Sequence, residues 1–352
     1  MIVVTGAYGF IGSCLVGFLN QKGITDIIAV DDFSKTEKEP NLVGKHIAQR
    51  IERSEFIDWF SNNTPSVSAV FHLGARTDTT EFDYAILEKL NLEYSKDVFN
   101  ICIKHSIPII YASSAATYGA GELGYDDHDP SVSEHLKPLN PYGISKNEFD
   151  KWVFETIENN KHPSPITHHP SPITDYPLLP ITHYPLPIAK WFGLKFFNVY
   201  GPNEYHKGRM ASTIFHFFNQ IEAKGEVSLF KSHRSDFEDG EQMRDFVYVK
   251  DVLKVMWFLF QNHQTVHSGI YNLGTGKARA FNDVVKNVFK NAHKPLTINY
   301  IPTPEDIRDK YQYFTEANMN KLHTEGYEEK FYSLEEGIED YIQHYLKPNL
   351  CY

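Results

Sequence analysis

A phenol and an ammonium group lie four residues apart in the segment Tyr142-Gly143-Ile144-Ser145-Lys146. At the start of a helix, this spacing places both side chains on one face. A phenol with a pKa of about 10 is a poor base at neutral pH until a neighbouring positive charge favours the phenolate. Lys146 would supply that charge, so the pair predicts an acid/base site for an alcohol. Taken alone, a Tyr and a Lys at this spacing are more often a surface pair.

Two serines, Ser113 and Ser114, close the apolar run 108–111. The run predicts a strand, and sites on open α/β sheets gather at the carboxyl ends of the strands. A serine hydroxyl at that position can hydrogen-bond a reacting alcohol and stabilise the oxyanion-like ketone stage. We therefore expect Ser114 to act beside Tyr142.

Three glycines, Gly6, Gly9 and Gly12, separate the first apolar run from a helix expected over 10–19. Glycines at these positions allow a tight turn, a close approach of the backbone to a pyrophosphate, and close packing of the helix on the sheet. The helix N-terminus then offers unpaired N–H groups and its positive dipole end to the anion. Because the triplet lies between strand and helix, it predicts a dinucleotide site rather than a purely structural turn.

An acidic pair, Asp31 and Asp32, ends the second apolar run about twenty residues after the glycines. A carboxylate there would bind the adenosine ribose and would favour NAD. Lys35 and Lys38 follow closely, and either cation could neutralise a 2′-phosphate and favour NADP. Residue types at these positions are compatible with both cofactors.

Alternating short β-branched runs and helical patterns must position these groups. This alternation predicts βαβ units and a parallel sheet, so the expected fold class is α/β, a Rossmann-type doubly wound parallel sheet with a smaller α/β substrate-binding lobe. The runs that predict strands are 2–4, 27–30, 69–71 and 108–111.

Two domains are expected from this pattern. Residues 1–198 form the dinucleotide-binding domain, and residues 199–352 form the smaller lobe, from which some segments return to the first domain. Within the lobe the sequence predicts a helix over 281–291 and a short strand over 296–301.

The composition excludes several classes of protein. The net charge of −11, without a Lys/Arg block, argues against nucleic-acid binding. The apolar N-terminus lacks the basic region of a signal peptide, and no window is long and apolar enough to span a membrane. Three scattered cysteines, Cys14, Cys102 and Cys351, indicate neither a disulfide framework nor a zinc cluster. We expect a cytoplasmic protein that uses no metal.

A proline-rich insertion over about 161–187 interrupts the pattern and contains a seven-residue near-repeat. Proline at this density sustains neither a helix nor a central strand, so we expect a polyproline-like surface loop. Its histidines suggest a metal site, but such a loop fixes no ligand geometry, and the low-complexity interpretation is favoured.

Together, the glycine triplet, the serine-ended strand and the Tyr-x-x-x-Lys pair resemble the extended short-chain dehydrogenase/reductases. Longer blocks resemble one subfamily, the ADP-glycero-manno-heptose 6-epimerases, and the resemblance covers nearly the whole chain except the proline-rich insertion. These blocks are 111–119, 197–202, 206–208, 244–249 and 271–276.

The resemblance implies an NADP-dependent epimerase, with NAD as the alternative cofactor. Ser114, Tyr142 and Lys146 match the usual catalytic set, and Lys207 matches a second acid/base. The sugar would be oxidised at C6″ to a transient ketone and would recover hydride on its opposite face, with Tyr142 and Lys207 each serving one substrate orientation. The resemblance also implies a small-molecule partner, an ADP-heptose, and a homo-oligomer, commonly a pentamer.

Further positions carry over from the resemblance, and Arg244 among them is a natural diphosphate partner. His216 has a second interpretation as a buried structural histidine among aromatic neighbours. The implied cofactor positions are Gly6, Gly9, Phe10, Ile11, Gly12, Asp31, Asp32, Lys38, Arg53, Leu73, Gly74, Ala75, Arg76, Thr77, Asn91, Lys146, Val199 and Lys207. The implied substrate positions are Ser114, Asn198, Arg209, His216, Phe230, Lys231, Ser232, His233, Arg244 and Tyr311.

The chain departs from the subfamily pattern at three places, two on the substrate side and one, Arg53, near the cofactor. Arg209 stands where a small serine is usual, and Arg53 replaces a lysine with conserved charge. The chain between Phe230 and Arg244 is longer than expected and carries added acidic residues. The sequence therefore supports the reaction class more firmly than the identity of the sugar.

Two rival functions remain open at this stage. Another nucleotide-sugar enzyme of the same fold is the nearer one, but Ala115-Ala116 replace the Asp-Glu pair that the related dehydratases use for elimination. A 4-epimerase would leave the block 206–208 without a special purpose. A non-catalytic dinucleotide-binding protein would be free to lose Ser114, Tyr142 or Lys146, and this chain retains all three.

Overall fold

A computed structural model describes residues 1–79, 81–161, 189–308 and 311–352. The proline-rich insertion predicted over 161–187 lies outside the described residues except for Lys161, which ends a helix.

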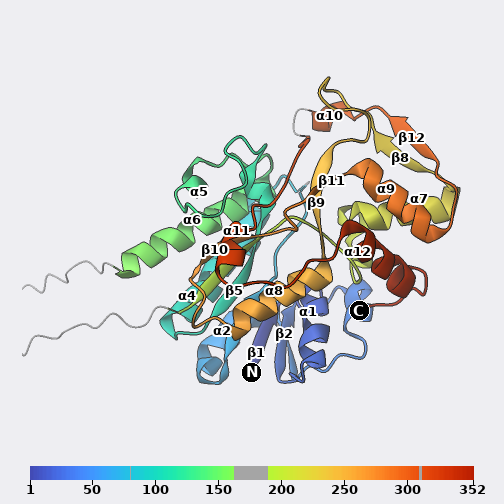
Figure 1. Ribbon diagram of the computed structural model, residues 1–352. Helices are drawn as coiled ribbons and strands as arrows, with labels where there is room; N and C mark the ends of the chain where they lie inside the picture. The colour runs from blue at the N-terminus through green and yellow to red at the C-terminus, as the bar shows by residue number, and fades with distance from the viewer. Residues whose placement is uncertain (80, 162–188, 309–310) are drawn as a thin grey trace, which may run out of the picture.

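A sheet of seven parallel strands forms the centre of the larger lobe (Figure 1). The strand order is β10-β6-β5-β4-β1-β2-β3, and every neighbouring pair is parallel. The predicted doubly wound parallel sheet is therefore confirmed. Its strands are β1 Ile2–Thr5, β2 Ile27–Asp31, β3 Gln49–Glu52, β4 Ala69–His72, β5 Ile109–Ser114, β6 Trp191–Phe196 and β10 Gly269–Leu273.

Helices cover both faces of this sheet because its strands are apolar on both faces. Successive strand residues alternate between two hydrophobic clusters: Val4 packs with α1 (Phe10–Gln21) and α8 (Val249–Gln261), and its neighbour Val3 packs on the other face. The helices on that second face are α2 Arg53–Asn63, α4 Tyr94–Lys104 and α6 Pro141–Lys161. This alternation is the period of two that a β-strand imposes.

The structure adds three strands to this sheet that the sequence pattern did not predict, β3, β6 and β10. β3 contains Gln-Arg-Ile-Glu and lies at the edge of the sheet, where only Ile51 is buried. β10 lies at the opposite edge, so part of the chain after residue 199 belongs to the large sheet.

The second lobe holds two small sheets and two long helices, α7 (Thr213–Lys224) and α9 (Phe281–Ala292), which pack together. β11-β9-β7 form one sheet, and β12-β8 form the other. Its strands are β7 Asn198–Tyr200, β8 Val227–Phe230, β9 Met243–Tyr248, β11 Ala278–Ala280 and β12 Ile298–Ile301. The remaining helices of the protein are α3 Tyr84–Leu87, α5 Val132–His135, α10 Glu305–Arg308, α11 Asn320–Thr324 and α12 Leu334–Tyr341. Short 3-10 and π segments are η1 Thr36–Leu42, η2 Thr64–Ser66, η3 Glu88–Glu93, η4 Ala115–Tyr118, η5 Tyr205–Met210 and η6 Ile342–Leu346.

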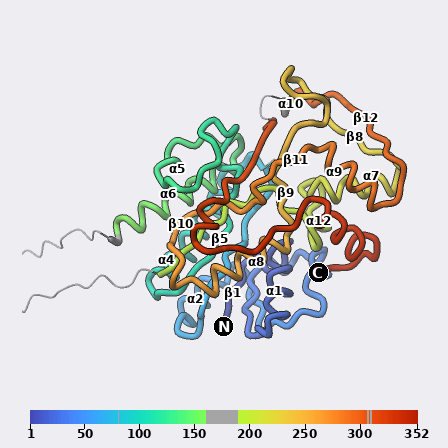
Figure 2. Tube along the Cα trace, viewed as in Figure 1, coloured from blue at the N-terminus to red at the C-terminus, as the bar shows by residue number. Residues whose placement is uncertain are grey.

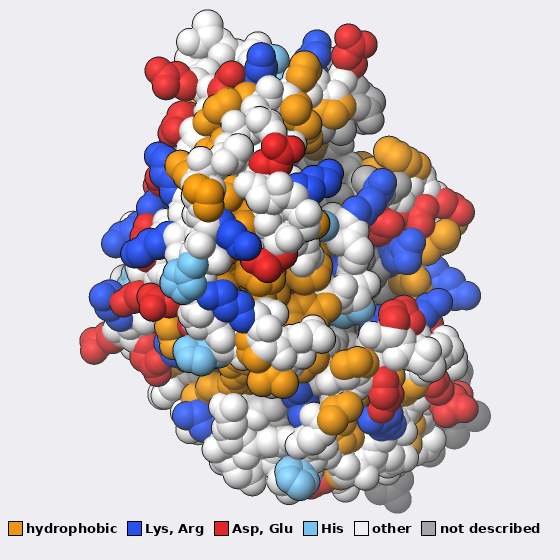
Figure 3. Space-filling view, turned by 90° about the vertical axis from the view of Figure 1, so that its right-hand side faces the viewer, with side chains coloured by type: hydrophobic (Ala, Val, Ile, Leu, Met, Phe, Trp, Pro, Cys, Tyr) orange, Lys and Arg blue, Asp and Glu red, His pale blue; other side chains and the backbone are white. Residues whose placement is uncertain are grey.

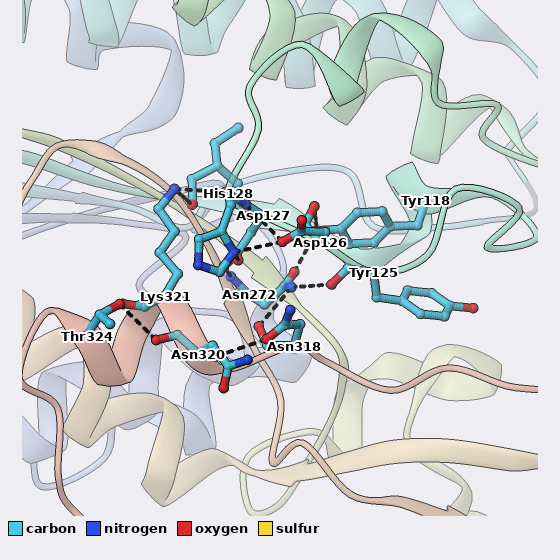
Figure 4. A network of polar contacts seen from close by, with 11 residues as sticks. Tyr118, Tyr125, Asp126, Asp127, His128, Asn272, Asn318, Asn320, Lys321 and Thr324 are labelled. Atoms are coloured by element: carbon cyan, nitrogen blue, oxygen red, sulfur yellow. Dashed lines mark hydrogen bonds and ion pairs between the residues drawn. The ribbon is translucent and has the colours of Figure 1, made fainter.

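After α10 the chain returns across the large lobe and passes β10 before it reaches α12 (Figure 2). Polar contacts tie this return to the loop between β5 and α6 (Figure 4). Asp127 accepts a hydrogen bond from the Asn272 backbone N–H at 2.6 Å, and the Lys321 ammonium donates to the carbonyl oxygens of Asp127 and Ile270 at 2.8 and 2.7 Å. These contacts join the loop, β10 and α11 in the larger lobe.

The face of the molecule drawn in Figure 3 carries Lys and Arg side chains interspersed with Asp and Glu, and hydrophobic side chains gather near its middle. Among the described helices, none has both the length and the apolar character needed to cross a membrane.

Candidate active site

A pocket of about 910 Å³ lies along the carboxyl ends of β1, β2, β4 and β5 and extends to β7 and η5 of the second lobe. Tyr142, Lys146, Ser114 and Lys207 line it together with the glycine turn. The pocket also takes in nearly all of the predicted cofactor positions, since Gly6, Gly9, Phe10, Ile11, Gly12, Asp31, Asp32, Lys38, Arg53, Leu73, Gly74, Ala75, Arg76, Thr77 and Val199 line it.

The glycine turn has the geometry that a bound dinucleotide requires. Gly6 has a φ of +69°, and a Cβ there would lie 2.7 Å from the Gly74 nitrogen. A Cβ at Gly12 would lie 2.1 Å from the Gly6 carbonyl oxygen. Gly9 is the N-cap of α1 and offers no side-chain cap, so the first N–H groups of the helix face the pocket without a side-chain acceptor. This arrangement suits the pyrophosphate of a dinucleotide.

The acidic pair after β2 is engaged within the protein. Asp31 accepts hydrogen bonds from the backbone N–H groups of Tyr8 and Asp32 at 2.9 and 2.8 Å, and it lies 3.4 Å from the Lys38 ammonium. Hydrogen bonds from Ser34 hold the pKa of Asp32 below its usual range. Lys35, Lys38 and Arg53 line the same end of the pocket, so cations and carboxylates share it.

Tyr94, which the sequence pattern did not single out, also lines this pocket. Its hydroxyl oxygen is buried without a hydrogen-bond partner among the described residues. Burial raises the pKa of Tyr94, and the field of Arg53 opposes that rise. The cations described above are one feature of the pocket that suits a polar cofactor. The buried Tyr94 hydroxyl, a hydrogen-bond donor near Arg53, is a second.

Asn91 was predicted to bind the cofactor but lies beneath the pocket surface. It is fully buried, its side-chain oxygen accepts from the Arg76 N–H at 2.7 Å, and its amide donates to the Arg76 carbonyl at 3.0 Å and to Ser145 Oγ at 3.1 Å. It therefore joins the segment 73–77 to α6 and acts on the pocket through Arg76.

The first turn of α6 positions Tyr142 and Lys146. Asn140 caps this turn by accepting a hydrogen bond from the Gly143 N–H at 2.8 Å. A Cβ at Gly143 would lie 2.8 Å from the Ala116 carbonyl oxygen, so the glycine lets α6 approach the end of β5. The helix thereby brings Tyr142 close to Ser114.

Burial and Ser114 have opposite effects on the protonation of Tyr142. Burial raises the pKa of Tyr142, and a hydrogen bond with Ser114 opposes the rise. The Lys146 ammonium donates to the Ala112 carbonyl oxygen at 2.8 Å, and burial lowers its pKa to about 8. Tyr142 is thus a neutral phenol in this structure, and Ser114 is the group that eases its ionisation.

Ser114 connects β5 to Tyr142 of α6. It is the last residue of the strand, and its hydroxyl accepts a hydrogen bond from the Ala116 N–H at 3.1 Å. The same hydroxyl is bonded to Tyr142. A serine held in this way can donate to an oxygen placed in the pocket.

Lys207 enters the pocket from η5 in the second lobe. Its ammonium lies 5.3 Å from the centre of the Phe10 ring, and burial lowers its pKa while the Glu204 carboxylate opposes that shift. Glu204 is fully buried and accepts hydrogen bonds from Ser212 Oγ at 2.7 Å and Tyr341 Oη at 3.0 Å. The neighbouring His206 also lines the pocket, and burial lowers its pKa to about 4, which keeps the imidazole neutral.

Several predicted substrate positions form an aromatic cluster around Arg244, apart from the residues that line the main pocket. The Arg244 guanidinium carbon lies 5.5 Å from the Tyr311 ring centre and 5.8 Å from that of Phe281. Phe230 and His233 contact Tyr311 edge to face, at 6.1 and 6.5 Å between ring centres. Phe281 lines the main pocket, so this cluster adjoins it.

The other predicted substrate positions are not part of this aromatic cluster. Asn198 lines the pocket. Arg209 is exposed, and its carbonyl oxygen lies 3.3 Å from Nε2 of the partly buried His216. The backbone N–H of Lys231 donates to Ile301, and that of Ser232 donates to Asp239 at 2.8 Å, inside the longer acidic segment. Neither Arg209 nor His216 lines the main pocket.

Sequence reasoning also missed a buried polar network behind the site. Asp150 and Lys195 are 2.9 Å apart and buried, and Ser113 Oγ donates to Asp150 at 2.6 Å. Asp150 in α6 and Lys195 in β6 do not form a recognisable sequence motif, because only the folded chain brings them together.

Among the described residues, one group has the spacing of metal ligands: Asp126, Asp127 and His128, whose ligand atoms lie within 4.8 Å of one another. His128 Nδ1 is 2.7 Å from Asp126 Oδ1, and Asp127 accepts the Asn272 N–H. Two of these residues are exposed and paired with each other. The arrangement serves the contacts of Figure 4.

Comparison with known proteins identifies a family. Residues 2–274 match the NAD dependent epimerase/dehydratase family. The ADP-L-glycero-D-manno-heptose-6-epimerase of Fusobacterium nucleatum is 45% identical over 355 residues and covers 98% of each chain. That of Nitratidesulfovibrio vulgaris strain DP4 is 43% identical over 348 residues, again over 98% of each chain.

A solved structure gives the same result. The ADP-L-glycero-D-manno-heptose-6-epimerase of Helicobacter pylori superposes with a TM-score of 0.73 and 25% identity, and the match covers 97% of this chain and 95% of that chain. These similarities confirm the resemblance to the extended short-chain dehydrogenase/reductases and to the heptose epimerases. The family's description names NAD, which supports a nicotinamide cofactor without specifying NADP.

Proposed function

Because the chain belongs to the NAD dependent epimerase/dehydratase family, we propose that it is an ADP-L-glycero-D-manno-heptose 6-epimerase. It converts ADP-D-glycero-D-manno-heptose to the L-glycero epimer, for the core of lipopolysaccharide, by transient oxidation at C6″. The observation that carries the proposal is the convergence of Ser114, Tyr142, Lys146 and Lys207 on one pocket with the glycine turn. The similarity to the heptose epimerases over nearly the whole chain supports the choice of sugar.

The bound nicotinamide supplies a hydride acceptor, a hydride donor for the return step, and a positive charge when oxidised. Tyr142 accepts the proton of the C6″ hydroxyl while the C6″–H bond is broken, and Ser114 donates a hydrogen bond to the same oxygen. Lys146 provides a fixed ammonium beside the glycine turn and favours the phenolate when the site is loaded. The half-buried Tyr142 thus becomes a base only in the complex.

Inversion requires hydride to return to the opposite face of the carbon, so the C6″ oxygen must occupy a second position. Tyr142 approaches the pocket from α6 in the larger lobe, and Lys207 approaches it from η5 in the second lobe. Two acid/base groups on different elements can each serve one orientation of the ketone. Lys207 therefore donates or accepts the proton in the orientation that Tyr142 does not serve.

For the cofactor, NADP is the proposal and NAD is the alternative. Lys35, Lys38 and Arg53 line the end of the pocket next to the acidic pair, and Asp31 already accepts two backbone N–H groups. A 2′-phosphate would find cations there, and Lys38 would exchange its ion pair with Asp31 for one with the phosphate. NAD remains the candidate if Asp32 binds the ribose instead.

The remaining parts of the proposal concern cellular context. The enzyme acts in the cytoplasm on a small nucleotide sugar, binds neither nucleic acid nor membrane, and assembles as a homo-oligomer, as a pentamer by the resemblance. Gel filtration with light scattering tests the assembly. The proposal also includes the cofactor-binding and substrate-binding roles predicted from the sequence, among them the substrate-binding roles of Asn198 and Arg244.

The test is incubation of the purified protein with ADP-D-glycero-D-manno-heptose, followed by NMR of the C6″ stereochemistry. We expect formation of the L-glycero epimer with no net change in the cofactor. Inversion of a UDP-sugar at C4, with the heptose left untouched, would establish the 4-epimerase alternative. Absence of any turnover together with tight cofactor binding would favour a non-catalytic binding protein.

A further inference from the structure

A buried ion pair lies directly behind the groups that react. Asp150 belongs to α6, one turn beyond Lys146 on the same helix face, and Lys195 belongs to β6, where it is the register partner of Ser113 on β5. The two charged atoms are 2.9 Å apart, and the two side chains are 0% and 3% exposed. Three elements that build the site therefore meet at this pair.

The Asp150 carboxylate is saturated with donors. Ser113 Oγ donates at 2.6 Å and the Lys195 ammonium at 2.9 Å, and both reach the same oxygen. Tyr111 Oη donates to the other oxygen at 3.3 Å. Asp150 thus binds β5 at two alternate residues, the second of which immediately precedes Ser114.

Lys195 extends the network to Ser114 itself. Its ammonium donates to Thr117 Oγ1 at 2.6 Å, and Thr117 Oγ1 donates to the Ser114 carbonyl oxygen at 2.8 Å. The ammonium also lies 4.9 Å from the centre of the Tyr118 ring. The backbone at Ser114 is consequently held from both sides, by Ser113 and by Thr117.

Stability alone does not account for this network. Removing two charges from water is costly, and replacing a buried ion pair by apolar side chains of similar volume is often neutral or stabilising. A buried polar network with every member satisfied instead fixes one arrangement of the surrounding elements. Here the elements fixed are the end of β5, η4 and α6, which carry Ser114, Tyr142 and Lys146.

The charge of Asp150 also acts on Lys146. It raises the pKa of Lys146 against the larger lowering by burial. His72, at the end of β4, feels the positive charge of Lys146, and its own pKa of about 3 leaves it neutral. Tyr142 and Tyr111 are the phenols nearby; burial raises the pKa of each, and the negative charge of Asp150 raises both further. Asp150 is therefore the charged group that helps Lys146 to keep its proton.

We propose that Asp150 and Lys195 are positioning residues that hold Ser114, Tyr142 and Lys146 in their working arrangement and keep Lys146 charged, a role that rests on the proposed function. Neither side chain lines the main pocket, so both act through other residues. The substrate class is unaffected by this role.

The test uses the full chain with the charge-neutral double substitution Asp150→Asn with Lys195→Met, because either single change would leave a buried charge unpaired. The matched control is Asp251→Asn with Lys254→Met on α8. That pair is 3.0 Å long and its carboxylate is fully buried like that of Asp150, although Lys254 is 27% exposed, and Asp251 accepts a backbone N–H from Tyr332 at 2.8 Å. Neither control residue lines the main pocket.

Four quantities are measured for each variant: the thermal unfolding midpoint, kcat and KM for the ADP-heptose across pH, and cofactor affinity across pH by protein fluorescence. We expect both variants to fold with similar unfolding midpoints. The site pair should lower kcat by about tenfold or more with little change in KM, because small misplacements of reacting groups are costly. In this variant, the decline of kcat and of cofactor affinity on the basic side of the pH profile should begin at lower pH. The reason is that Lys146 loses the carboxylate that favours its ammonium form.

The inference would be overturned if the Asp150→Asn with Lys195→Met variant had the wild-type kcat and if its kcat and cofactor affinity declined at the same basic pH as in the wild type. A loss of kcat accompanied by an equal loss in the α8 control would overturn it too, because the effect would then be general destabilisation. Cofactor affinity provides a readout that does not depend on the sugar. If the wild type fails to epimerise the ADP-heptose, the proposed function fails, and the pH dependence of cofactor affinity still decides this inference.

Should the double variant fail to fold, Ser113→Ala removes one donor to Asp150 and leaves the ion pair in place. A fall in kcat with an unchanged unfolding midpoint would support the positioning role. An unchanged kcat in a folded Ser113→Ala protein would contradict the role of the hydrogen bond to β5.

Discussion

At the scale of single residues, burial is the largest cause of the pKa shifts of the proposed acid/base groups. Tyr142 is a phenol whose pKa is raised, and Lys146 is an amine whose pKa falls to about 8, so in both cases burial favours the neutral form. Lys207 is shifted in the same direction as Lys146. A lowered pKa makes it easier for an amine such as Lys207 to exchange a proton with a sugar hydroxyl.

Activity should decline as the pH rises through about 8, because Lys146 then loses the proton that makes it an ammonium. Activity falls rather than rises with pH because Lys146 carries its charge only below its pKa, and burial lowers that pKa in the folded protein. Lys146→Arg retains its charge at higher pH, since a guanidinium pKa exceeds about 12. We expect this variant to be slower and its basic limb to move to higher pH. A pH profile of kcat with the same basic limb in both proteins would contradict the assignment.

Lys207→Met should sharply reduce epimerisation while Tyr142 remains intact. Loss of one positioned acid/base group typically costs a factor of about 10² to 10⁴ in rate. NMR of the C6″ epimers measures the effect directly. Lys224→Met, which removes an exposed lysine at the end of α7, is the control for loss of charge and should retain activity. Wild-type turnover by Lys207→Met would exclude Lys207 as the second acid/base.

The sequence singled out Ser114, Tyr142, Lys146 and Lys207, which the structure brings to one pocket, because each lies in a short motif. It could not predict Asp150, Lys195 or Tyr94, whose significance depends on contacts among several elements. Asn91 illustrates the intermediate case: its place beside the cofactor site was anticipated, but its contacts run to Arg76 and Ser145 rather than into the pocket.

At the scale of secondary structure, the turn between β1 and α1 depends on the absence of side chains. Gly6 and Gly12 leave no room for a Cβ, because their neighbours are backbone atoms that cannot move aside. Gly17, in the same helix as Gly12, differs because an added Cβ would meet side chains rather than backbone, the end of Lys45 at 2.9 Å and the Tyr352 ring at 3.5 Å.

Gly12→Ala should therefore weaken cofactor binding and destabilise the protein by about 1–3 kcal/mol, the usual cost of overpacking. Gly17→Ala is the matched control and should be nearly neutral or stabilising by up to about 1 kcal/mol, because alanine favours the helix. Denaturant unfolding and fluorescence titration with cofactor measure both effects. Equal stability and equal affinity in the two variants would show that the α1 turn tolerates a side chain at residue 12.

Four strands of the large sheet, β1, β2, β4 and β5, were predicted from their continuous apolar runs, whereas the buried β6 and the edge strand β3 were not. The residues of β3, Gln49–Glu52, are mostly polar, because an edge strand buries few of its side chains. The sequence predicted that some segments of the second lobe return to the first domain, but it did not identify β10 as one of them. The long connections through the second lobe obscure the order of the strands.

At the scale of the whole molecule, both lobes contribute to one pocket. The glycine turn, α6 and the end of β5 come from the larger lobe, and Lys207 comes from η5 of the second lobe. The fully buried Glu204 joins η5 to α12 through its bond from Tyr341. Changes near the end of the chain can therefore reach Lys207.

A cofactor bound across this pocket should raise the unfolding temperature, because a ligand at about 100 times its Kd adds about 2.7 kcal/mol to the stability of the folded state. At equal concentrations we expect NADP to stabilise more than NAD. Lys38→Ala should diminish the advantage of NADP and spare the response to NAD, since it removes a cation beside Asp31. Greater stabilisation of the unmodified protein by NAD would assign NAD as the preferred cofactor.

Transient oxidation at C6″ is the central claim, and isotopic labelling tests it most directly. ADP-D-glycero-D-manno-heptose carrying deuterium at C6″ should yield the L-glycero epimer with the deuterium retained, because the hydride that leaves the carbon returns to it. In D₂O, unlabelled substrate should gain no deuterium at C6″. Loss of the label, or its entry from solvent, would contradict hydride transfer and would indicate inversion by removal of a proton from carbon.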